Sequence, residues 1–108
     1  MIFTGLTITF LKHFVIGLEV TFPLILSLIV VITLLGQIVG AKEGWSRFDS
    51  LYWSFITATT VGYGDIRPIN RGSRIVSIFI AFLGLILTGI IIAIAVHAGT
   101  LALDTTGH

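Results

Sequence analysis

The nine residues "TATTVGYGD", from Thr57 to Asp65, are the part of the sequence whose residue types and spacing could do chemistry. Gly62 and Gly64 have no side chain, so the backbone there can adopt angles that are closed to other residues. A segment built in this way uses its backbone more than its side chains. The chemistry to consider is therefore the binding of cations by carbonyl oxygens.

The composition indicates a chain that is surrounded by lipid. Of its 108 residues, 56% are hydrophobic and 10% are charged, and its mean hydropathy is +1.10. A soluble domain carries about 25% charged residues, because it needs a polar surface. A net charge of +1 disfavours nucleic acid as a partner, since phosphate binding needs a concentrated basic face. The absence of cysteine excludes disulfides and thiolate metal sites.

Two apolar stretches are long enough to cross a membrane. Residues 22–39 are uncharged and, at about 1.5 Å per residue, nearly cross a hydrocarbon core of about 30 Å. Residues 75–96 are uncharged and cross it fully. In residues 1–14 the cation Lys12 follows the apolar run, the reverse of a cleavable signal peptide, so we expect these residues to be retained. They form either a short interfacial helix or an extension of the first span.

The link between the two spans, residues 40–74, holds eight of the eleven charged residues. Ser46 and Asp49 have the spacing of a capping box, which predicts that a helix begins after Ser46. We expect this helix to cover residues 47–59, too few to cross the membrane, and to be followed by irregular chain. Non-helical backbone at membrane depth must be buried in protein or line a water-filled path. Cations in such a path would satisfy its carbonyl groups.

In this context the run Thr60-Val61-Gly62-Tyr63-Gly64-Asp65, preceded by Thr57, resembles the selectivity-filter signature of potassium channels. The order of span, pore helix, filter and span over about residues 22–96 is similar to the two-transmembrane pore module of that family. The resemblance implies an all-α, multi-pass protein of the cell (inner or plasma) membrane, with K⁺ as permeant ion and no organic cofactor. One signature without an internal repeat implies a single pore domain over residues 1–108, with three further identical subunits completing a homotetramer.

The resemblance also assigns roles within the filter, residues 60–65. It implies that carbonyl oxygens of the filter, with the Thr60 hydroxyl, replace the water shell of a K⁺ ion. Backbone angles that alternate in hand would point these oxygens the same way, which explains Gly62 and Gly64. The residues implied to bind K⁺ are Thr60, Val61, Gly62, Tyr63 and Gly64.

Residues around the filter are implied to support it: Tyr52, Trp53, Thr57 and Asp65. Tyr52 stands where relatives usually have a tryptophan that binds the matching aspartate, so we predict a hydrogen bond from the Tyr52 hydroxyl to Asp65. Ile56 stands where many prokaryotic members carry a glutamate, which is absent here.

The second span is expected to line the inner pore. Gly84 matches the hinge glycine of the family, and the residues that follow on one face are Leu85, Thr88, Ile92 and Val96. Lipid contact or close helix packing explains the same pattern, and both alternatives stay open. His97 is either a pH-sensitive group at the inner end, since histidine titrates near neutral pH, or an ordinary interfacial residue.

The Lys and Arg residues and the family resemblance predict opposite orientations of the chain in the membrane. Five of the six Lys and Arg residues lie in the link, which the family places outside the cell, whereas the positive-inside rule alone would place it in the cytoplasm. We give the filter signature priority, and a cytoplasmic regulatory domain missing from this chain would account for the difference. Arg67 also departs from many relatives, which carry an uncharged residue there.

Three other functions fit less well. Non-selective cation channels usually alter the residues that match Tyr63 or Asp65, and both are present here. A non-conducting membrane subunit would leave the filter sequence without a purpose. An enzyme is not expected, because the histidines at 13, 97 and 108 are far apart in sequence and no catalytic motif occurs.

Overall fold

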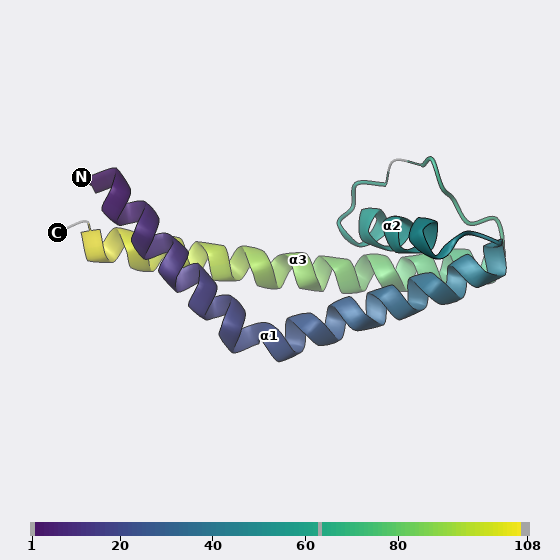
Figure 1. The fold of residues 1–108 in the computed structure, drawn as a ribbon, viewed down its shortest axis with the longest axis horizontal. Helices are drawn as coiled ribbons and strands as arrows, with labels where there is room; N and C mark the ends of the chain where they lie inside the picture. Colours follow the sequence, from purple (N-terminus) through teal and green to yellow (C-terminus); the bar gives the residue numbers. More distant parts are fainter. Residues whose placement is uncertain (1, 63, 107–108) are drawn as a thin grey trace. The chain divides into compact units, whose positions relative to one another are not determined.

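The computed structural model describes residues 2–62 and 64–106. Figure 1 shows its elements in chain order, α1 (Ile2–Glu43), α2 (Arg47–Ala58) and α3 (Arg71–Thr106). The described residues contain no strand, so the predicted all-α class is confirmed. Both α1 and α3 are long and apolar enough to cross a membrane.

The two long helices extend past the predicted spans at both ends. Residues 2–14 belong to α1 without a break, so the structure has them as an extension of the first helix and not as a separate one. Pro23 consequently lies inside α1, where it cannot donate a helical hydrogen bond. This position adjoins a division of the chain into two compact units.

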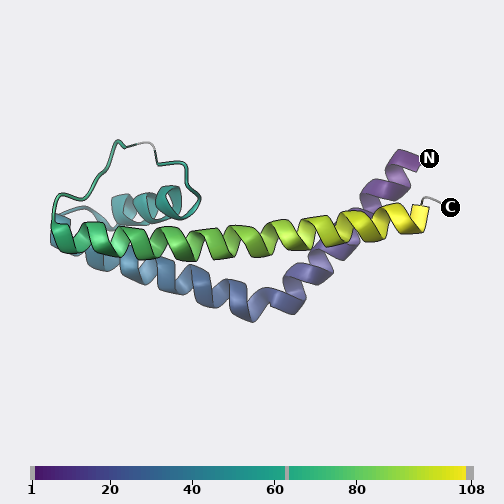
Figure 2. The ribbon, with the colours of Figure 1, turned by 180° about the vertical axis from the view of Figure 1, so that it is seen from behind.

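The first unit consists of Ile25–Thr88 and the second of the segments up to Leu24 and from Gly89 onward. In the first unit, α2 lies alongside the adjoining parts of α1 and α3, as Figures 1 and 2 both show. The prediction of a single pore domain stays a prediction.

The short helix α2 begins where its sequence predicts. Ser46 is the N-cap, and its side chain accepts a hydrogen bond from the Asp49 amide at 3.0 Å. The helix ends at Ala58, one residue before the predicted end, with Thr59 as the C-cap. The buried core beside it is formed by apolar residues of all three helices: Ile32, Val39, Trp53, Ile56, Ala58 and Ile80.

Glycines of α1 let α2 approach closely. A Cβ atom at Gly36 would lie 1.6 Å from the Ser54 hydroxyl oxygen, and one at Gly40 would lie 1.7 Å from that of Ser50. Both serines are buried, and their hydroxyls donate to carbonyl groups four residues earlier in the chain. The helix α2 is thus seated on α1 at two points where no side chain fits.

We predict that Gly36→Ala lowers the free energy of unfolding by about 1–3 kcal/mol, because the added methyl group overpacks the contact with Ser54. Reversible detergent unfolding followed by far-UV circular dichroism measures the change. Gly5→Ala is the matched control, since a Cβ atom there has nothing within 4 Å. Equal stability of the two variants would contradict the contact.

Candidate functional site

The backbone changes hand from residue to residue over Thr60, Val61 and Gly62, and Gly64 is left-handed again. Thr60, Gly62 and Gly64 have φ angles of 64°, 53° and 81°, whereas Val61 is not among the described residues with positive φ. The left-handed angles predicted at Gly62 and Gly64 are confirmed, and Tyr63 lies outside the described residues. Thr60 was not predicted to share this angle, and no sequence signal indicated it, because positive φ is uncommon for a threonine.

The segment is tied to the end of α2 by backbone hydrogen bonds. The amide groups of Thr59, Thr60 and Gly62 donate to the carbonyl groups of Phe55, Thr57 and Ile56, at 2.9, 3.2 and 3.0 Å. Carbonyl groups in the last turn of a helix have no partner within the helix. Here they are satisfied by the segment that follows, which fixes its position relative to α2.

The outer surface of this segment is open within a single chain. Thr60, Gly62, Gly64 and Asp65 are exposed, and Val61 is 49% exposed. The backbone C=O groups of such an exposed segment need polar partners from outside the chain.

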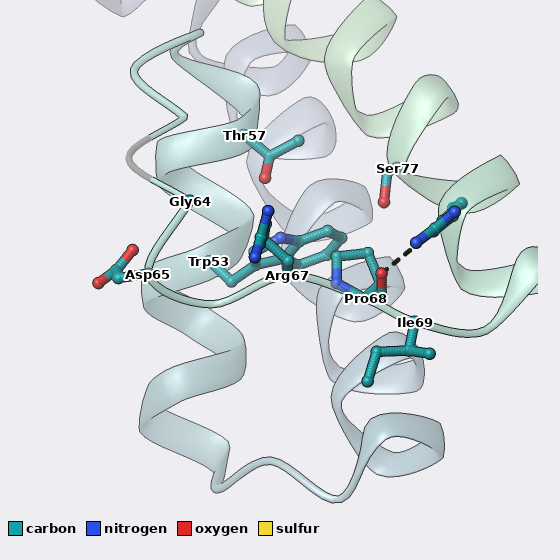
Figure 3. Close-up of a pocket in the computed structure, with 9 residues that line it drawn as sticks. Trp53, Thr57, Gly64, Asp65, Arg67, Pro68, Ile69 and Ser77 are labelled. Atoms are coloured by element: carbon teal, nitrogen blue, oxygen red, sulfur yellow. Dashed lines mark hydrogen bonds between the residues drawn. The ribbon is translucent and has the colours of Figure 1, made fainter.

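Two of the four side chains predicted to support the filter, Trp53 and Thr57, lie beside the loop that follows Gly64. Trp53 is 3% exposed and packs against Trp45, with ring centroids 5.3 Å apart. Trp53 and Thr57 line a cavity of about 680 Å³ together with the loop after Gly64. Figure 3 shows this cavity, with the Asp65 carboxylate pointing away from Trp53. Tyr52 packs against the buried core, and its hydrogen bond to Asp65 stays a prediction.

Glu43, at the end of α1, holds the chain between the filter segment and α3, and sequence reasoning missed it. Its carboxylate accepts hydrogen bonds from the backbone amides of Ile69 and Asn70, the latter at 3.2 Å, and from the Asn70 side chain at 2.5 Å. Arg74 adds a bond from its Nε to the Pro68 carbonyl at 3.3 Å. No local pattern indicates a pair 27 residues apart, although Asn70 stands directly before α3, where caps occur.

The structure places Gly84 in a helix contact. A Cβ atom there would lie 2.0 Å from the Ala58 carbonyl oxygen, so Gly84 lets α3 pass close to the end of α2. This is the packing role that the sequence left open, and the hinge role stays a prediction.

The predicted inner-pore face of α3 is not covered within the single chain. Leu85, Ile92 and Val96 are 53%, 55% and 63% exposed, and Thr88 is exposed as well. These residues form one stripe, separate from the buried Ile80 and Gly84. Their assignment to the pore stays a prediction, as does the pH sensitivity of the exposed His97.

Comparison with known proteins decides the family. A family profile described as "Ion channel" matches residues 20–100. The chain belongs to this ion channel family. With two helices able to cross a membrane, the channel is a membrane protein.

Similar proteins include three that are named as potassium channels. TWiK family of potassium channels protein 7 from Caenorhabditis elegans is 44% identical over 66 residues, 60% of this chain and 12% of that protein. Potassium channel AKT1 from Arabidopsis thaliana is 47% identical over 49 residues, 44% of this chain and 6% of that protein. A voltage-gated potassium channel from Aeropyrum pernix is 42% identical over 40 residues, 37% of this chain and 14% of that protein.

The channel thus spans a small part of the length of these relatives. No solved structure matches it significantly.

We predict that Glu43→Gln loosens the chain before α3. In the wild type the N–H donors meet carboxylate oxygens, whereas in the variant the amide NH₂ group replaces one of these oxygens and cannot accept. A loss of about 1–3 kcal/mol in the free energy of unfolding is expected. Hydrogen exchange at residues 66–70 should accelerate. Glu19→Gln, at an exposed site on the same helix, is the control and should leave exchange in residues 66–70 unchanged. Unchanged exchange in Glu43→Gln would show that the carboxylate does not hold this chain.

Proposed function

We propose that the channel conducts K⁺ selectively as one of four identical subunits. The observation that carries the proposal is the positive φ angle at Thr60, Gly62 and Gly64. Backbone angles that alternate between left-handed and right-handed turn successive carbonyl groups to the same side. Carbonyl oxygens of residues 60–63 and the Thr60 hydroxyl then replace the water shell of a K⁺ ion. One chain supplies a quarter of the ring, so four copies around an axis complete the site.

The neighbouring elements favour a cation at this place. The C-terminal end of α2 meets the filter segment, and the dipole of a helix places about half a negative charge at that end. Three relatives with 42–47% identity over the matched residues are named as potassium channels. The proposal therefore rests on backbone geometry and on similarity.

The remaining predicted residues complete the pathway. The exposed stripe of α3 lines the inner pore of the tetramer, and Ile92 and Val96 form an apolar constriction that gates by dewetting. Asp65 and Arg67 stand at the outer mouth, where the Tyr52 hydroxyl holds the Asp65 carboxylate. The link between the spans faces the outside of the cell membrane.

A reversal potential tests the function. The purified protein is reconstituted in liposomes with K⁺ on one side and mixed K⁺ and Na⁺ on the other. The proposal predicts a reversal that follows K⁺ at about 59 mV per tenfold gradient, as expected for one elementary charge. Gly62→Ala should abolish this current, because the alanine is strained at the positive φ of that position.

Two other results would contradict the proposal. A reversal near zero when Na⁺ balances K⁺ would indicate a non-selective cation channel. The absence of current from protein that is tetrameric by crosslinking would indicate a non-conducting membrane subunit.

We predict that external tetraethylammonium blocks the channel weakly and that Arg67→Tyr strengthens the block roughly tenfold. Four exposed arginines at the mouth repel an approaching cation, and a tyrosine in their place removes that charge. Dose–response curves for block of K⁺ current measure the effect. Arg47→Gln removes another exposed arginine, at the start of α2, and should leave the block unchanged. Equal block of wild type and Arg67→Tyr would place Arg67 away from the mouth.

A further inference from the structure

The compact unit formed by the N-terminal part of α1 and the C-terminal part of α3 holds a candidate site of its own. A cavity of about 410 Å³ opens there between the two helices. His13 of α1 and His97 of α3 both line it. Most of its other lining residues are aliphatic, among them Ile16, Val20 and Leu101. Two imidazole groups therefore share one apolar cavity, and the filter has no use for either.

The packing of the helices places the two histidines at the same level. Gly17 allows close approach, since a Cβ atom there would lie 2.5 Å from the Cγ2 atom of Ile94. The two segments run in opposite directions, because a second cavity joins Leu6 and Phe10 to Gly99 and Leu103, beyond this contact.

His13 precedes Gly17 by four residues, and His97 follows Ile94 by three. In antiparallel helices both steps lead about one turn, roughly 5 Å, in the same direction. His13 and His97 are therefore displaced from the Gly17–Ile94 contact toward the same end of this unit, and both line the cavity.

The Lys, Asp and Glu residues nearby lie outside the cavity. Lys12, Glu19 and Asp104 are exposed, and none of them lines it. Asp104 follows His97 by seven residues and thus lies two turns further along the same side of α3, where its charge favours a cation. The described residues offer no group of three or more His, Asp or Glu that could bind a metal ion together. Water would have to supply the remaining ligands of any ion bound here.

We propose that His13 and His97 bind one divalent transition-metal ion of the Zn²⁺ or Ni²⁺ class in each chain. Neutral imidazole nitrogen binds ions of this class in preference to K⁺, Na⁺ or Mg²⁺. The ion joins α1 to α3 directly after Val96, at the end of the predicted inner-pore stripe. Binding requires only the two helices of this unit, so the site does not depend on the channel being selective for K⁺.

Calorimetric titration of the tag-free protein in detergent with Ni²⁺ tests the site. One ion per chain should bind to the wild type, and either His13→Gln or His97→Gln should weaken binding at least tenfold, as ligand-set changes do. His108→Gln removes the third histidine of the chain and is the matched control, which should bind as the wild type does.

A second variant guards against loss of the fold. The double substitution His13→Cys and His97→Cys should bind Cd²⁺, since thiolates prefer soft ions, while far-UV circular dichroism shows unchanged helix content. The proposal is overturned if the wild type binds no Ni²⁺, or if His108→Gln weakens binding as much as His13→Gln does. It is equally overturned if the folded cysteine variant fails to bind Cd²⁺.

Discussion

Hydrogen bonds from the backbone amides of Thr59, Thr60 and Gly62 to last-turn carbonyl groups of α2 are the interaction on which the site depends. They let the chain pass from the end of a helix into a segment of alternating hand without leaving the carbonyls of Phe55, Ile56 and Thr57 unsatisfied. The position of α2 therefore determines the position of this segment. Close contacts at Gly36 and Gly40 seat α2 on α1, and the contact of Gly84 with Ala58 brings α3 to its end. Three long-range glycine contacts thus support one short segment of backbone.

The far end of the segment is held by different chemistry. There a single carboxylate, Glu43, gathers the backbone amides of Ile69 and Asn70 and the Asn70 side chain. A charged acceptor forms stronger hydrogen bonds than a neutral one, which suits a chain with few apolar contacts. The segment between α2 and α3 therefore lies between a helix end that it satisfies and a carboxylate that anchors its exit. The long helices supply both supports, and they also expose many large apolar side chains.

The sequence predicted what local rules determine and missed what distant residues determine. Ser46 as a cap and positive φ at Gly62 and Gly64 follow from neighbours in the chain, and the structure confirms them. The Glu43 clamp and the seating of α2 on Gly36 join residues far apart in sequence, so no period or motif signals them. The long helices run past the predicted spans at both ends, because charges such as Lys12 bound an apolar span without ending a helix. The inner-pore face and the Tyr52–Asp65 bond remain predictions, since the first depends on contacts between chains.

The central claim is that a left-handed backbone angle within residues 60–64, and not the absence of bulk, is what ion binding requires of glycine. A Cβ atom at Gly62 meets nothing within 4 Å, so space alone would admit one. The most direct measurement compares K⁺ flux through semisynthetic protein carrying L-alanine or D-alanine at this position. D-alanine favours positive φ, so the account predicts flux near that of the wild type with D-alanine and none with L-alanine. Equal flux from both forms, or flux from the L-alanine form alone, would contradict it.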